Sequence, residues 1–194
     1  MGFDRTIKLL KKGVIWFFWM TPFICSAAAV HNNQVALVRV GPEKLSFVFD
    51  LNMGPLLNRL VAPQLTFDEF LSKYSKIGVV EFRNDLAKAS KSLEMDCQIL
   101  TPDGATYRLS DWQLPDAAQL QVLIKKSIFL SQMDPEQAHI EPVTVKAQVV
   151  SKKPLYRLKL HLPNYLMPVW VVNGENDKFW LTEKMPIQII DIAP

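Results

Sequence analysis

The sequence predicts an α+β fold with an N-terminal strand pair, two to three helices and a hairpin, followed by a β-rich, sandwich-like C-terminal half. Three observations predict this order. Apolar and polar side chains alternate between residues 44 and 51, as they do in half-buried strands. Between residues 66 and 131, apolar side chains recur mostly at helical spacing. Beyond residue 142, five short apolar runs are separated by turn residues.

The first element, residues 1–29, has the pattern of a secretory signal peptide. Four basic residues precede an apolar run over residues 14–24, and small residues follow it. A positive head, a short apolar segment and a small-residue exit are typical of a cleaved leader, with the cut after Ala29 or after Ala28. An uncleaved membrane anchor is the alternative, because residues 14–30 give 17 positions without a charge, the lower limit for a span.

Removal of this leader changes the charge of the protein. The chain of 194 residues holds 22 basic and 19 acidic residues, and four of the basic and one of the acidic ones lie in the leader. Residues 30–194 therefore hold equal numbers of each and carry no net charge, so we expect no nucleic-acid partner. Their length suits a single α+β domain, with possible lobes at 30–132 and 141–194.

The N-terminal half begins with two strands, residues 34–40 and 44–51, and a short helical stretch at 55–61. Thr66 and Glu69 then have the spacing of a capping box, which starts a helix. A second helix is expected over residues 79–93. The expected inner faces of these two helices consist of Phe67, Phe70, Leu71 and Tyr74, and of Phe82, Leu86, Ala89 and Leu93.

A hairpin is predicted next, with strands at 96–101 and 105–110 around an Asp-Gly turn. Cys97 lies in its first strand, and we expect a buried thiol without a disulfide partner. Trp112 and Pro115 are placed in the loop that leaves the hairpin. A helix over 116–131 follows; the same run could form a strand, but its length and the preceding Pro-Asp pair favour a helix.

The C-terminal half is predicted to contain strands only. Residues 143–150 and 155–162 form a hairpin in which Tyr156, Leu158, Leu160 and Leu162 point inward. A second hairpin has strands at 167–172 and 178–182 around Asn173-Gly174, and a final strand covers 187–192.

Candidate binding residues lie on the outward face of the 143–162 hairpin. Alternation places Lys146 on one side of the sheet with Arg157, Lys159 and His161. Such a cationic strip could bind lipid phosphates, lipopolysaccharide or an acidic protein. The alternative is that these residues are the solvated face that an antiparallel sheet commonly has.

Two further features are candidate sites. If cleavage follows Ala28, His31 becomes the third residue, and its imidazole joins the terminal amine and two amides in a square-planar set suited to Cu(II) or Ni(II). Cleavage after Ala29 removes that geometry. The aromatic residues Trp170 and Trp180 are expected in the core, whereas an exposed Trp180 beside Tyr165 would mark a docking surface.

The sequence contains no motif for nucleophilic catalysis, phosphate binding or metal ligation at the usual spacings, and no cofactor is expected. We expect a non-catalytic cell-envelope protein, periplasmic or secreted, that binds or scaffolds another envelope protein or an anionic envelope surface. Attachment to the inner membrane, with the domain outside the cytoplasm, requires an uncleaved leader. The alternatives are an exported hydrolase whose site comes from distant residues and a periplasmic metal-binding module that uses the mature N-terminus.

Overall fold

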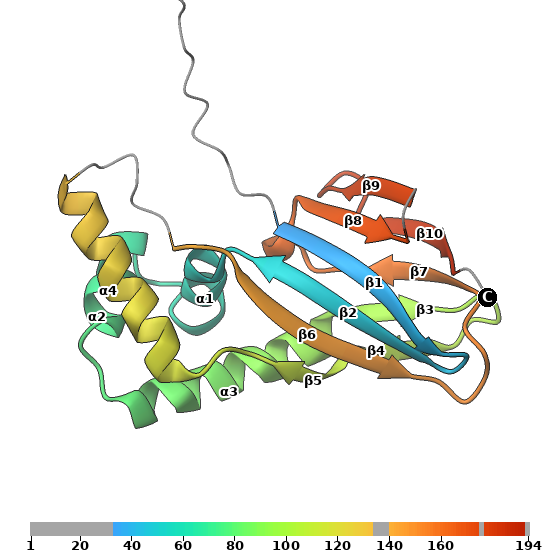
Figure 1. Cartoon of the computed structure of the whole chain (residues 1–194), viewed down its shortest axis with the longest axis horizontal. Coiled ribbons are helices and arrows are strands. Elements are labelled where there is room, and N and C mark those ends of the chain that lie inside the picture. Colours follow the sequence, from blue (N-terminus) through green and yellow to red (C-terminus); the bar gives the residue numbers. More distant parts are fainter. Residues whose placement is uncertain (1–32, 134–139, 175–176, 193–194) are drawn as a thin grey trace, which may run out of the picture.

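A computed structural model describes residues 33–133, 140–174 and 177–192. Within them the predicted α+β fold is confirmed: ten strands form two sheets, and four α-helices gather mainly at one end of the molecule (Figure 1). The leader, His31 and the loop at 134–139 lie outside the described residues. Among the helices described, none combines the length and the hydrophobicity that crossing a bilayer requires.

The larger sheet has the strand order β5-β6-β2-β1-β8-β9. The predicted N-terminal pair lies at its centre, where β1 is antiparallel to β2 and parallel to β8. Strands from both halves of the chain therefore build this sheet. The bounds are β1 Asn33–Gly41, β2 Lys44–Leu51, β5 Ser110–Gln113, β6 Val143–Val150, β8 Val169–Asn173 and β9 Asp177–Leu181.

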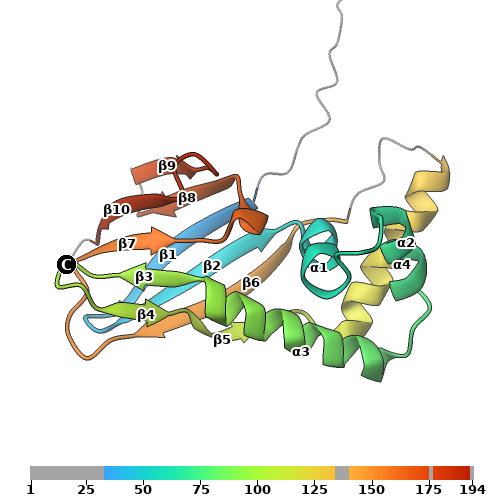
Figure 2. The ribbon, with the colours of Figure 1, turned by 180° about the vertical axis from the view of Figure 1, so that it is seen from behind.

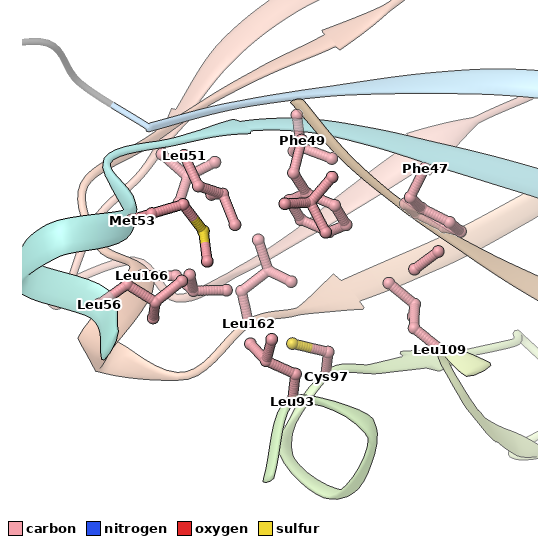
Figure 3. Packing of buried hydrophobic residues seen from close by; sticks show 14 of the residues in the cluster. Phe47, Phe49, Leu51, Met53, Leu56, Leu93, Cys97, Leu109, Leu162 and Leu166 are labelled. Carbon is pink, nitrogen blue, oxygen red and sulfur yellow. The ribbon is translucent and has the colours of Figure 1, made fainter. Parts of the chain in front are cut away.

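The smaller sheet has the order β10-β7-β3-β4 and also combines strands from both halves. Its inner face meets that of the larger sheet in one hydrophobic cluster. Figure 3 shows Phe47 and Phe49 pointing from β2 toward Leu162, Cys97 and Leu109. The bounds are β3 Gln98–Leu100, β4 Thr106–Arg108, β7 Arg157–His161 and β10 Ile187–Asp191.

Three of the described helices begin within one residue of the predicted position, and α1 begins two residues earlier than predicted. In the capping box, the amide of Thr66 donates to the Glu69 carboxylate at 2.8 Å, and the amide of Glu69 donates to the Thr66 hydroxyl at 3.3 Å. Asp116 accepts a bond of 3.0 Å from the amide of Ala118, which starts a helix and excludes the strand alternative for this segment. The bounds are α1 Met53–Val61, α2 Phe67–Tyr74, α3 Val79–Asp96 and α4 Ala117–Met133.

The predicted 143–162 hairpin is wrong. β6 pairs with β2 and β5 in the larger sheet, whereas β7 pairs with β3 and β10 in the smaller one. Between them, the amides of Ser151 and Leu155 donate to the carbonyls of Glu43 and Pro42 at 2.9 and 2.8 Å. The chain is thus held across the end of the β1–β2 turn and passes from one sheet to the other.

Three smaller predictions need correction. Tyr156, which is predicted to point inward, is 56% exposed, because Leu155 is the buried residue just before β7. The guanidinium of Arg39 lies over the tyrosine ring. Trp112 belongs to β5, an edge strand of the larger sheet, and its indole stacks on Phe49. The helix expected to end at residue 93 continues to Asp96, so the hairpin strand starts later than predicted.

Candidate functional site

Three of the four predicted binding residues lie on the outer face of β7. Leu158 and Leu160 are buried in the core, so the alternation of the strand turns Arg157, Lys159 and His161 to the outside. In Figure 2 this side of the small sheet is in front, and α3 leads into the start of β3 without crossing the strands. The outward orientation predicted for these residues is therefore present.

Lys146 is not brought together with them. Its side chain is exposed on the outer face of the larger sheet, where its strand partners are Val48 on β2 and Gln113 on β5. Because β6 and β7 belong to different sheets that face each other, their outer faces point in opposite directions. The cationic strip that the sequence predicts is divided between the two sides of the molecule.

Arg108 takes the fourth position on the outer face of the small sheet. Gln98 of β3 is the strand partner of both Arg108 on β4 and His161 on β7, so these three residues share a transverse row. We call the set of Arg108, Arg157, Lys159 and His161 the basic face. Arg108 was missed because only the pairing of β3 with β7 links it to the other three, and no local sequence signal shows that pairing.

Two isoleucines border the basic face. Ile187 pairs with His161 and Ile189 pairs with Lys159, and both isoleucines are on the edge strand β10. Their exposed fractions are 46% and 56%, which is high for large aliphatic side chains. The outer surface of this sheet is thus both cationic and apolar, a combination suited to an amphipathic anionic partner.

Carboxylates neutralise only part of the positive charge. Arg157 forms an ion pair with Asp191, and this pair raises the pKa of the guanidinium and lowers that of the carboxyl. Lys153, beyond the end of β7, pairs with Asp103 at 2.9 Å. No ion pair within residues 33–133, 140–174 and 177–192 includes Arg108, Lys159 or His161.

The turn between β3 and β4 shapes the end of the basic face. Gly104 adopts a φ of +83°, and the carboxylate of Asp103 accepts bonds from the Thr101 hydroxyl at 2.6 Å and from the Lys153 amine at 2.9 Å. These two bonds lower the pKa of Asp103 to about 2. Hollows of about 240 and 440 Å³ flank this turn, and Arg157 lines both of them.

The other candidates from the sequence have ordinary structural positions or lie outside the described part of the chain. His31 belongs to the latter group. Among described residues, no group of three or more His, Cys, Asp or Glu side chains could hold a metal ion. Cys97 is fully buried, as predicted. The expected core position of Trp180 is wrong: its side chain is 38% exposed and lies opposite the half-buried Trp170 on the larger sheet, with the ring centroids 4.6 Å apart.

Comparison of the chain with models of protein families, with curated proteins and with solved structures finds no match.

Proposed function

We propose that the protein is exported and binds an anionic component of the cell envelope through the basic face, without catalysing a reaction. One observation carries the proposal. Arg108, Lys159 and His161 lie on the outer surface of one sheet beside two exposed isoleucines, and no ion pair among the described residues includes any of the three. A sheet face that served only for solvation would not need large aliphatic side chains at its edge.

The net charge of the protein supports binding at the basic face and not a general attraction of the whole molecule to polyanions. Residues 30–194 carry no net charge, so the molecule as a whole would not attract polyanions, and binding would depend on the local charge of the basic face. Exposed charges interact over about 8 Å at physiological ionic strength. We therefore expect binding that depends on salt and on the position of the lysine and arginine residues, and that does not follow total charge.

A charge-reversal experiment tests the proposal. The protein from residue 30 onward is mixed with the envelope fraction of its host, and the retained amount is measured after sedimentation at low and at high salt. We expect the double variant Arg108→Glu, Lys159→Glu to lose most of the salt-sensitive retention. The control is Lys146→Glu, which reverses one exposed lysine on the opposite side of the molecule, and the single variant Lys159→Glu matches it in charge. Equal retention of these two single variants would contradict the proposal.

The proposed export rests on the pattern of residues 1–29 and needs its own measurement. N-terminal sequencing of the protein recovered from its host should give a chain that starts at Val30 or Ala29. An intact Met1 in the membrane fraction would show that the leader remains as an anchor.

A further inference from the structure

The edge strand β10 offers backbone groups for hydrogen bonding. Among the described strands, β10 has one neighbour, β7, and it ends the small sheet. Just after it, the amide of Ile192 donates to the carbonyl of Tyr156 at 2.7 Å, so this position bonds toward β7. The preceding carbonyl, that of Asp191, instead accepts a bond of 2.8 Å from the side-chain amide of Asn173 on β8, which lies on the other side.

This alternation fixes the direction of the remaining groups. In an antiparallel pair, successive residues point their N–H and C=O groups alternately toward and away from the neighbouring strand. Ile189 and Ile187 lie two and four positions before Asp191 along β10, so their backbone groups point the same way as those of Asp191. Their backbone groups therefore point away from β7 toward the open edge, and their side chains are exposed beside Lys159 and His161.

A cleft lies along the same edge. It has a volume of about 320 Å³ and separates β10 from β9, the edge strand of the larger sheet. Phe179 and Lys178 line it from β9, and residues 188–191 line it from β10. An extended segment added to β10 would place every second side chain in this cleft, against the half-buried ring of Phe179, and the others on the outer side.

The outer side is where the charge lies. A residue paired with Ile189 would share a transverse row with Lys159, and one paired with Ile187 would share a row with His161. A carboxylate paired with Ile189 would lie beside Lys159, which no ion pair among the described residues includes, whereas a basic side chain there would be repelled. The ring of Phe179 is the apolar part of the cleft wall, and Asn173, Lys178 and Gln188 are polar parts of it, so an apolar residue of the added segment would pack on Phe179.

We infer that β10 is the binding edge for an extended segment of a partner protein in which acidic and apolar residues alternate. This inference rests on the proposed function and names the partner at the basic face as a peptide strand, not a lipid surface. Addition of a strand to a free sheet edge is an established mode of peptide recognition, in which main-chain bonds give affinity and alternate side chains give specificity.

Ile189→Pro tests the edge directly. Proline removes the N–H that points to the open edge and leaves the bonds between β10 and β7 in place. The probe is a short end-blocked peptide that alternates glutamate and valine, with binding measured by isothermal titration. We expect Ile189→Pro and Lys159→Glu each to weaken binding about tenfold, a loss of roughly 1.4 kcal/mol. Ile189→Val is the matched control and should bind like the unaltered protein. Undiminished binding by Ile189→Pro overturns the inference.

A second measurement uses the unaltered protein and so does not depend on the folding of a variant. Saturation with the probe peptide should slow hydrogen exchange at the amides of Ile187 and Ile189, and a peptide with lysine in place of glutamate should not. Unchanged exchange overturns the inference, as does protection of these amides by self-association without peptide. If Arg108→Glu, Lys159→Glu abolishes envelope binding while Ile189→Pro retains it, the proposed function stands and the edge assignment fails.

Discussion

The hydroxyl of Tyr165 donates a hydrogen bond of 2.9 Å to the carboxylate of Asp96, a residue 69 positions earlier in the chain. Tyr165 belongs to the short 3-10 helix Asn164–Leu166 after β7, and Asp96 is the last residue of α3. The bond thus ties the end of α3 to the segment that leads into β8.

This contact predicts a loss of stability at alkaline pH. Burial and the nearby Asp96 raise the pKa of Tyr165 in the folded state. The contribution of Tyr165 to the free energy of unfolding is complete below the pKa of an unfolded tyrosine, about 10, and declines as the pH rises above that value. Tyr165→Phe should lower the free energy of unfolding by about 1 kcal/mol at neutral pH and show a weaker alkaline decline. Urea titrations at several pH values measure both effects; identical alkaline slopes would falsify this account.

The opposite dependence is expected for the Asp103–Lys153 pair. Bonds from Thr101 and Lys153 lower the pKa of Asp103 to about 2. The contribution of this carboxylate is therefore complete above its unfolded pKa of about 3.9 and is lost as the pH falls toward 2. Asp103→Asn should be less stable than the unaltered protein near pH 6, and the difference should shrink in acid. A difference that stays constant between pH 6 and pH 2 would contradict the assignment.

Cys97 should be inert in the folded protein. Its side chain is fully buried, and burial raises the pKa of the thiol, so the reactive thiolate is suppressed. An aromatic disulfide reagent should modify it only as fast as the protein unfolds, and immediately in denaturant. Replacement by serine introduces a buried hydroxyl and should cost about 1–3 kcal/mol in the free energy of unfolding. Rapid labelling of Cys97 without denaturant would contradict this, because it would require local unfolding around the buried thiol.

The Trp170–Trp180 pair should stabilise the β8–β9 hairpin. The two residues are direct cross-strand partners, and their rings are tilted by 57°. Such pairs contribute about 0.5–1.5 kcal/mol beyond the area that they bury. A double-mutant cycle with Trp170→Leu and Trp180→Leu, followed by chemical denaturation, should give a coupling energy in this range. If the losses in the free energy of unfolding from the two substitutions are strictly additive, the rings bury apolar area but do not stabilise each other.

The order and type of most elements follow from local patterns. The capping box at Thr66 and Glu69, the Asp-Gly turn and the alternation in β6 and β7 act within a few residues, and each appears in the structure. Alternation also gives the correct outward side for Arg157, Lys159 and His161. These signals state which way a side chain faces within its own strand.

The pairing of strands is not local, and the wrong predictions arise from it. Residues 151–154 look like a hairpin turn, but the bonds of Ser151 and Leu155 to the β1–β2 turn carry the chain to the other sheet. This crossing separates Lys146 from the rest of the predicted strip. Conversely, Arg108 and Ile189 join Lys159 and His161 only through long-range register, which periodicity in the sequence does not contain.

The parallel pair of β1 and β8 has a consequence for how the chain reaches its fold. Asn33 pairs with Val169, so a very long loop must close before the centre of the larger sheet is complete. Closing such loops is slow, and topologies dominated by distant contacts fold slowly. The first strands lack one lateral neighbour until the last quarter of the chain has been synthesised.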